Sequence, residues 1–431
     1  MKYFSLNGSS DRVDFKTATI LGQAPDKGLY FPEEIPVWEK SFFDNEAGKP
    51  ATELAFELIR PYVGGTIPDE TLATIVSETL NFPIPLLRLS DNLFTLEMFH
   101  GRTLAFKDIG ARFMSRCLGY FVRDSRQKVT VLVATSGDTG GAVADGFYGV
   151  EGVEVVILFP KGKVSQVQRK QLTTLGANIR AVEVNGNFDD CQRLVKQAFA
   201  DKELTKAMFL TSANSINVAR WLPQQFFYLM AWLQWPDKMH APVISVPSGN
   251  FGNICAGLLC KKSGLPVKHF LAACNANKAV PDFFITGHYE PRTAIPTISN
   301  AMDVGDPSNF IRIRKLFHNN QQQLSSVLTA YSFTDEETKA AIKELYRDFQ
   351  YWADPHGAVG YLALKKYLQS HPYEKGIFAE TAHPIKFFDT TTSLIDKELE
   401  MPPSIREIMH LPESAVAIEP QYLMLKSMLL G

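Results

Sequence analysis

Short apolar runs rich in β-branched residues alternate with longer amphipathic stretches from residue 129 onward. The apolar runs predict buried strands at Val129–Ala134, Val155–Phe159, Ile179–Val184, Met208–Thr211 and Val243–Val246. The stretches between them predict helices at Thr139–Tyr148, Ser165–Leu175, Asp189–Ala200 and Ile216–Trp235. Because strands that alternate with helices form βαβ units, the pattern predicts an α/β fold with two parallel or mixed sheets flanked by helices.

The two ends of the chain follow this pattern less closely. The first ninety residues carry turn signals such as Gly64–Gly65 and Pro83–Pro85, and we expect a mainly helical accessory region there. Towards the C-terminus the pattern predicts helices at Asp335–Trp352 and Ala358–Gln369, a strand at Gly376–Phe378 and an ordered loop at Thr297–Phe310.

The length of the chain predicts more than one domain. A chain of 431 residues is too long for a single ordinary core, so two or three domains are expected. We predict the accessory region at residues 1–90, a smaller α/β domain at 91–225 and a larger α/β domain at 226–431.

Composition and charge narrow the class of protein. The chain is 45% hydrophobic and 21% charged, as in a globular protein, and its net charge of −2 argues against a nucleic-acid partner. The most apolar stretch, Phe226–Trp235, is too short to span a bilayer and predicts a buried helix. Met1–Phe15 lacks the apolar core of a signal peptide. We therefore expect a cytoplasmic protein with no membrane partner.

The cysteines favour the same compartment. There are five, an odd and dispersed set, at Cys117, Cys191, Cys255, Cys260 and Cys274. The closest pair lacks a second pair of cysteines or histidines at zinc-site spacing, so reduced, buried thiols are expected and no metal site is assigned.

Two glycine-rich turns each follow a predicted strand and open a predicted helix. They are ATSGDTGG at residues 134–141 and VPSGNFGN at residues 246–253. Glycine allows a tight turn and a close backbone approach, and the N–H groups of the next helix favour an anion. Ordinary tight turns remain an alternative, and neither turn matches the dinucleotide or Walker pattern.

Lys107 is a candidate reactive amine. It ends the apolar stretch of HGRTLAFKD at residues 100–108. A lysine in a desolvated site loses its proton more readily and can bond to a carbonyl carbon, although a lone lysine is more often a solvated surface residue.

Two further segments carry polar side chains suited to a ligand. If a helix starts near Ser215, Asn217 and Arg220 lie on one face and, with Ser215, can bind a phosphate, although a capping serine and a surface arginine would look the same. In ETAHPIKF, at residues 380–387, a hydroxyl follows the last predicted strand, whereas His383 and Lys386 are more often structural.

Taken together, these segments resemble threonine synthase, within the fold-type-II pyridoxal-phosphate enzymes and specifically its longer bacterial and fungal branch. The resemblance lies in HGRTLAFKD, ATSGDTGGAV, SANSIN, VPSGNFGN, SNAMDVGDPSN and ETAHPIKF, with DKGLYFP near the N-terminus. The match runs in the expected order from about residue 10 to about residue 390. It implies pyridoxal 5'-phosphate as the cofactor and O-phosphohomoserine as the substrate, converted with water to threonine and phosphate.

The resemblance also implies roles for single residues. Lys107 matches the lysine that holds the cofactor aldehyde, Thr381 the hydroxyl partner of the pyridine nitrogen, and Asp138 the place of a contact to the phenolic oxygen. The cofactor phosphate loop is matched by Gly249, Asn250, Phe251, Gly252 and Asn253. The substrate carboxylate loop is matched by Thr135, Ser136, Gly137 and Thr139, and the substrate phosphate site by Ser215, Asn217 and Arg220.

The sequence departs from the family's pattern at two places, and three alternative classes of function remain open. Arg102 stands where the family more often has proline, and Asn277-Lys278 replaces a common asparagine-aspartate pair. The alternative activities are a dehydratase of hydroxyamino acids or a phospho-amino-acid lyase. A phosphate- or nucleotide-binding protein and an inactive scaffold are the other readings, and the sequence does not separate a monomer from a dimer.

Overall fold

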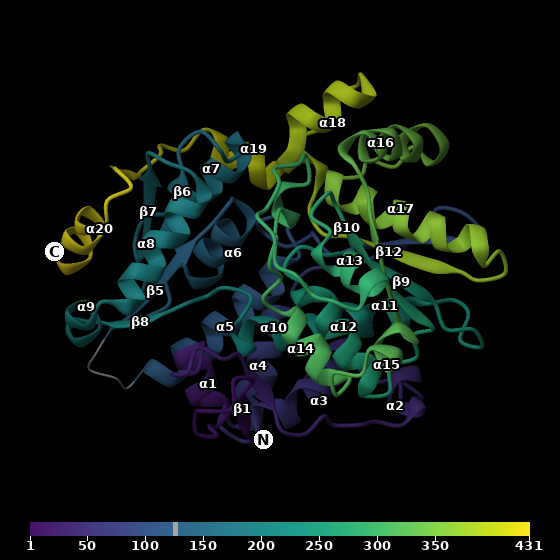
Figure 1. The fold of residues 1–431 in the computed structure, drawn as a ribbon, viewed down its shortest axis with the longest axis horizontal. Coiled ribbons are helices and arrows are strands. Elements are labelled where there is room, and N and C mark those ends of the chain that lie inside the picture. Colours follow the sequence, from purple (N-terminus) through teal and green to yellow (C-terminus); the bar gives the residue numbers. More distant parts are fainter. Residues whose placement is uncertain (124–127) are drawn as a thin grey trace.

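The computed structural model describes residues 1–123 and 128–431, which form two large sheets and a small one (Figure 1). The five-stranded sheet is entirely parallel, in the order β13-β7-β6-β5-β8. Its strands are β5 (Val129–Ala134), β6 (Val153–Pro160), β7 (Ile179–Val184), β8 (Phe209–Thr211) and β13 (Val416–Ile418). The connecting helices are α6 (Asp138–Phe147), α7 (Gln166–Thr173), α8 (Phe188–Ala200) and α9 (Lys202–Ala207).

The six-stranded sheet has the order β11-β10-β9-β12-β4-β3, and only β3 runs antiparallel to its neighbour. Its strands are β3 (Leu86–Arg88), β4 (Leu93–Glu97), β9 (Val243–Pro247), β10 (His269–Cys274), β11 (Leu328–Ser332) and β12 (Gly376–Glu380). Helices near this sheet are α11 (Gln225–Gln234), α12 (Gly252–Lys262), α13 (Ala279–Thr286), α14 (Phe310–Leu316), α15 (Gln321–Ser325), α16 (Asp335–Phe349) and α17 (Pro355–Ser370), with a 3-10 turn, η2 (Asn300–Met302).

The N-terminal residues lie beneath both sheets in the view of Figure 1. They form β1 (Tyr3–Ser5), α1 (Phe15–Leu21), β2 (Tyr30–Pro32), α2 (Lys40–Asp44), α3 (Ala51–Val63) and α4 (Asp69–Thr79). Above them, α5 (Lys107–Val122) packs against α4, α6 and α10 (Val218–Trp221). The helix α5 therefore joins the N-terminal region to the elements of the five-stranded sheet.

The C-terminal segment crosses from one sheet to the other (Figure 1). After β12 it forms η3 (Pro384–Phe387), α18 (Phe388–Ile395), α19 (Pro403–Met409), β13 and α20 (Tyr422–Leu430). Strand β13 pairs with β7 at the edge of the five-stranded sheet. The chain thus forms β3 and β4 of the six-stranded sheet first and then β5 to β8 of the five-stranded sheet. It returns to the six-stranded sheet for β9 to β12, and its last strand, β13, completes the five-stranded sheet. The domain limits given above stay a prediction.

The predicted strands are confirmed within one or two residues, and β5 and β7 match fully. The predicted helices from Thr139, Ser165, Asp189, Asp335 and Ala358 are confirmed with shifts of up to three residues at an end. The single helix predicted at Ile216–Trp235 is wrong. It is divided into α10, a 3-10 turn η1 (Leu222–Gln224) and α11, because Pro223 cannot donate a helical N–H and distorts the turn before it. The loop expected at Thr297–Phe310 is broken only by the short turn η2.

Large apolar side chains fill the space beneath the six-stranded sheet. Helix α11 is buried as expected, and Trp221, Trp232 and Trp235 are among the largest fully buried side chains. All five cysteines are free and buried, as the sequence predicts. Among the residues the structure describes, no helix is long and apolar enough to cross a membrane.

One buried arginine ties the N-terminal region to the rest of the molecule. Arg312, in α14, is fully buried and donates to the carbonyl oxygens of Tyr30 and Ile216 and to the side chain of Asn309. A planar guanidinium can reach three such acceptors at once, which a lysine ammonium at the same place cannot.

We expect the Arg312→Lys variant to lose about 2–4 kcal/mol of unfolding free energy, because buried carbonyl oxygens are left without donors. Urea unfolding followed by tryptophan fluorescence measures the change. Arg347→Lys is the control, since the Arg347 side chain is 72% exposed. Equal midpoints for the two variants would contradict the structural role of Arg312.

Candidate active site

A short loop before α5 positions Lys107. The Asp108 carboxylate accepts the backbone N–H and the hydroxyl of Thr103, which closes the loop on itself. The Phe106 N–H donates to the carbonyl oxygen of Thr381, 2.9 Å away, and an isolated bridge joins Ala105 to Ala382. Lys107 is therefore fixed as the first residue of α5, beside the carboxyl end of β12.

The Lys107 amine is largely removed from solvent. Its side chain is 16% exposed, and Nζ lies 3.4 Å from Oδ2 of Asp138. Burial lowers the pKa of Lys107 most strongly, the Asp138 charge opposes this, and the charges of Lys386 and Arg220 lower the pKa further. The net shift is downward, so the neutral, nucleophilic form is favoured. The alternative of a solvated surface lysine is wrong.

Asp138 is the only carboxylate that the structure pairs with Lys107 among the described residues, and it has two further partners. Oδ1 accepts a hydrogen bond from Gln168 at 3.0 Å and lies 2.8 Å from the Nζ atom of Lys386. Burial raises the pKa of Asp138, but the positive charges of Lys386 and Lys107 outweigh it and hold the pKa well below its ordinary value. The carboxylate is therefore ionised although it is buried.

The first glycine turn leads from β5 into α6. The Thr135 hydroxyl accepts the N–H groups of Gly137 and Gly140, so it holds the turn together. Gly137 has φ of 135°, and a Cβ atom there would lie about 2.4 Å from the Gln168 side chain. Ser136 and Thr139 are partly exposed in the same turn. Their contact with a substrate carboxylate stays a prediction.

The second glycine turn leads from β9 into α12 and has little room for side chains. Phe251 adopts the left-handed conformation with φ of 59°. A Cβ atom on Gly249 would lie 2.6 Å from Cα of Met302. The Asn250 side chain accepts the N–H of Ser308 at 2.6 Å. The turn thus packs tightly against the segment around η2 and opens a long helix at Gly252, an arrangement that suits a phosphate.

Asn253 and Ser215, both expected to contact ligands, instead make hydrogen bonds to other protein side chains in or near this turn. The Asn253 side chain contacts Tyr228 and, at 3.9 Å, the sulfur of Met98, so it stabilises the start of α12. The Ser215 hydroxyl accepts a hydrogen bond from Asn250 at 2.5 Å. Ser215 therefore lies against the predicted cofactor phosphate loop.

The predicted shared helix face of Asn217 and Arg220 is wrong. Helix α10 begins only at Val218, and Asn217 is its N-cap, whose Oδ1 accepts the Ala219 N–H. The Asn217 amide also donates to the Thr19 carbonyl oxygen. A helix starting near Ser215 was expected, but the asparagine side chain competes for the backbone N–H and places the start later.

Arg220 is the one charged member of this group, and its positive charge contributes to lowering the pKa of Lys107. It is buried, Nη1 donates to the Ala213 carbonyl oxygen, and Nε has no hydrogen-bond partner among the described residues. Burial lowers the pKa of Arg220 to about 10, and the Asp108 charge opposes that shift. A buried guanidinium with an unused N–H is suited to an anionic ligand.

The sequence analysis missed several residues that shape this site. Lys386 is fully buried and holds Asp138, yet the sequence offered no feature that separates it from a structural lysine. Gln168 and Met302 lie far from the glycine turns along the chain. Only the SNAMDVGDPSN segment of the resemblance pointed to Met302. Arg102 is 65% exposed and pairs with Asp145, so it points outward.

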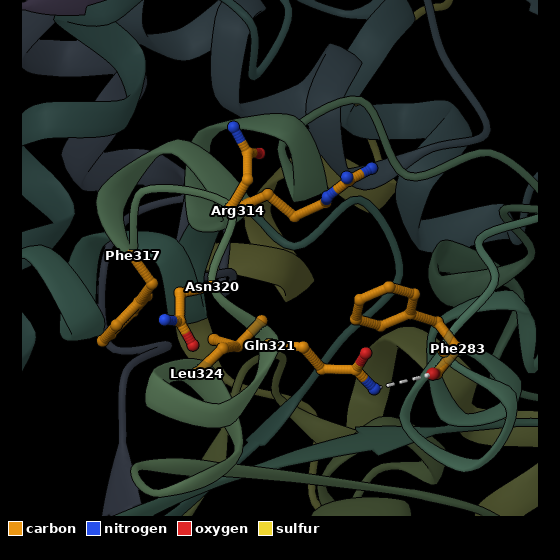
Figure 2. Close-up of a pocket in the computed structure, with 8 residues that line it drawn as sticks. Phe283, Arg314, Phe317, Asn320, Gln321 and Leu324 are labelled. Carbon is orange, nitrogen blue, oxygen red and sulfur yellow. Dashed lines mark hydrogen bonds between the residues drawn. The ribbon is translucent and has the colours of Figure 1, made fainter.

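A separate pocket of about 100 Å³ lies among α13, α14 and α15 (Figure 2). Phe283, Arg314 and Gln321 contribute to its wall, and Gln321 donates to the Phe283 carbonyl oxygen. It includes none of the site residues predicted from the sequence.

The site fits pyridoxal phosphate on its own geometry. Lys107 supplies an amine with a lowered pKa for an aldehyde, and the turn at 249–253 supplies a close backbone approach for a phosphate. The family described as pyridoxal-phosphate dependent enzyme matches residues 78–379. More distant structures such as maize serine racemase, at 16% identity and a TM-score of 0.56, share the fold. The protein is thus a fold-type-II pyridoxal-phosphate enzyme.

More specific matches cover the whole chain. The families described as threonine synthase N terminus and threonine synthase, C-terminal match residues 2–80 and 357–428. The threonine synthase of Haemophilus influenzae is 42% identical over 100% of both chains. The Escherichia coli threonine synthase crystal structure superposes with a TM-score of 0.92 at 40% identity, covering 100% of this chain and 99% of that one. The chain belongs to the threonine synthase family.

A structure described as PLP-bound threonine synthase from Brucella melitensis superposes with a TM-score of 0.93 at 33% identity, again covering 100% and 99% of the chains. The expected cofactor and fold are thereby confirmed. The roles of the single site residues stay predictions.

We expect Gly249→Ala to weaken pyridoxal phosphate binding about tenfold or more, because the methyl group overpacks the contact with Met302. Titration of the apoprotein, followed by absorbance, measures this. Gly149→Ala is the control, since its methyl group would enter open space and the backbone strain at its φ of 71° lies outside the predicted cofactor turn. An unchanged affinity in Gly249→Ala would remove this turn from the cofactor site.

Proposed function

We propose that this chain converts O-phospho-L-homoserine and water to L-threonine and phosphate. The observation that carries the proposal is a buried amine, Lys107, whose pKa is lowered by burial and in part by the charge of Arg220, a buried arginine with an Nε–H that has no partner among the described residues. One group suits proton transfer and the other suits the phosphate of the substrate. Family membership supports the same reaction.

Lys107 is proposed to hold the cofactor aldehyde and, when free, to take and return protons at the substrate carbons. Its neutral form is required for both tasks, and burial together with Lys386 and Arg220 favours that form. When bound, pyridoxal phosphate supplies an electron sink that stabilises negative charge on the substrate carbons.

The remaining predicted residues orient the ligands. Gly249, Asn250, Phe251, Gly252 and Asn253 are proposed to shape the phosphate loop, with Asn253 acting through Tyr228 rather than by direct contact. Thr381 is 6% exposed and follows β12, where its backbone is fixed by Phe106. Its neutral hydroxyl is proposed to meet the pyridine nitrogen without keeping it protonated as a carboxylate would.

The substrate contacts are proposed for the first glycine turn and for Arg220. Ser136, Gly137 and Thr139 suit the substrate carboxylate, whereas Thr135 acts by holding the turn. For the substrate phosphate we propose Arg220, while Asn217 caps the helix that carries it. The Ser215 hydroxyl accepts a hydrogen bond from Asn250 and is proposed to support the cofactor phosphate loop.

This arginine argues against one rival activity, the dehydratase of hydroxyamino acids. A plain dehydratase has no substrate phosphate to bind, so a buried arginine with an unused N–H favours a phosphorylated substrate. We propose the cytoplasm as the compartment, which the five free, buried thiols support.

We expect the purified protein to release threonine and phosphate in equal amounts from O-phosphohomoserine, and we expect Lys107→Ala to release neither. Amino-acid analysis and a phosphate assay on the same samples measure both products. Release of 2-oxobutyrate with phosphate would indicate the lyase activity instead. Full turnover by Lys107→Ala would contradict the assigned lysine.

We expect Arg220→Gln to raise the KM for O-phosphohomoserine about tenfold to a hundredfold, the loss expected for a charge-assisted hydrogen bond. Inhibition by inorganic phosphate should weaken in parallel. Arg347→Gln, on the exposed face of α16, is the control. An unchanged KM would remove Arg220 from the phosphate site.

A further inference from the structure

Lys386 is a buried lysine for which neither the sequence nor the proposed reaction provides a role. It lies in η3, directly after β12, and its side chain is 0% exposed. Its Nζ atom lies 2.8 Å from Oδ1 of Asp138 and 2.8 Å from the Thr103 carbonyl oxygen. Lys386 therefore has two acceptors within hydrogen-bond distance, and one of them is the carboxylate that Lys107 also approaches.

Lys107 and Lys386 compete for the same carboxylate. Lys386 approaches Asp138 to 2.8 Å, whereas Lys107 approaches it only to 3.4 Å. A single carboxylate balances one positive charge, so two ammonium groups here would leave a net positive charge in a buried site. Of the two amines, Lys107 has the longer contact with Asp138, and its pKa is lowered.

The charged groups that face Lys107 come from three elements. Asp138 lies at the start of α6, Lys386 lies in η3 and Arg220 lies in α10. Asp108, its neighbour in α5, is turned towards Thr103. Of these groups, only Asp138 favours a charged Lys107, and its closest contact is with Lys386.

We propose that Lys386 is a positioning residue that occupies Asp138, so that Lys107 keeps a neutral amine for the cofactor aldehyde. The proposal rests on the assignment of Lys107 made above. The lone pair of the neutral amine adds to the aldehyde carbon, and a carbon–nitrogen double bond forms as the aldehyde oxygen leaves in one molecule of water. An ammonium group has no lone pair for this step.

Three variants separate this role from simple support of the fold. Lys386→Met removes the competing charge at similar volume. Asp138→Asn removes the carboxylate and leaves Lys386 charged, and the double variant removes both charges. Lys365→Met is the control, because it breaks a partly exposed pair with Glu344 elsewhere.

The full-length apoprotein of each variant is mixed with pyridoxal phosphate over a series of pH values. The rate of growth of the absorbance at ~410–420 nm reports bond formation at the lysine. This readout does not depend on turnover of a substrate. Lys107→Ala serves as the blank.

In Lys386→Met we expect the rate at neutral pH to fall roughly tenfold and the pH profile to move to higher pH, because Lys107 then pairs with Asp138 as an ammonium. In Asp138→Asn we expect the profile to move to lower pH, since an unbalanced Lys386 charge faces Lys107. The double variant should return close to the native profile.

An unmoved profile in folded Lys386→Met would overturn the proposal, as would a double variant no faster than Lys386→Met. If Lys386→Met does not fold, Asp138→Asn and the double variant decide, and a profile unmoved in Asp138→Asn is the contrary result. Absorbance growth in Lys107→Ala would instead refute the assigned lysine, which is a failure of the proposed function.

Discussion

A buried carboxylate with two lysine partners joins the two sheets of this molecule. Asp138 begins the helix that follows β5 of the five-stranded sheet, and Lys386 follows β12 of the six-stranded sheet. Lys107 opens α5, which packs against α6. Since a buried charge is stabilised when it is paired, this contact ties together the ends of strands from both sheets, and it holds a carboxylate next to the Lys107 amine.

Two buried arginines differ in how fully their N–H groups are used. Burial lowers the pKa of both Arg312 and Arg220 to about 10. Arg312 gives its donors to two backbone carbonyls and to Asn309, and so joins the N-terminal region to α14. Arg220 keeps a buried Nε without a partner among the described residues. Burial alone therefore does not distinguish them, whereas the use of their N–H groups does.

The elements with strong periodicity were predictable, and those decided by capping or proline were not. The strands β5 and β7 have the predicted bounds. Strand β5 is buried at every residue, as expected for a strand covered on both faces, whereas β7 is recognisable from its apolar positions although Arg180 is exposed. The helix expected from Ile216 failed, since Asn217 caps α10 later and Pro223 interrupts the continuation. The hydrophobic pattern also could not predict which strands share a sheet. The strands β4 and β13 join partners hundreds of residues away, and nothing local records that pairing.

The sequence by itself determined the residues that we propose for the chemistry and their order along the chain: Lys107, the two glycine turns, Arg220 and Thr381. Glycine turns after strands and a lysine after an apolar stretch are local features, so they can be recognised from the sequence alone. The tertiary structure decided which of these residues meet. It placed Ser215 on the phosphate loop, used both polar atoms of Asn217 inside the protein and brought Lys386 to Asp138. Burial, charge pairing and the competition of two lysines for one carboxylate depend on distances that only the folded chain creates.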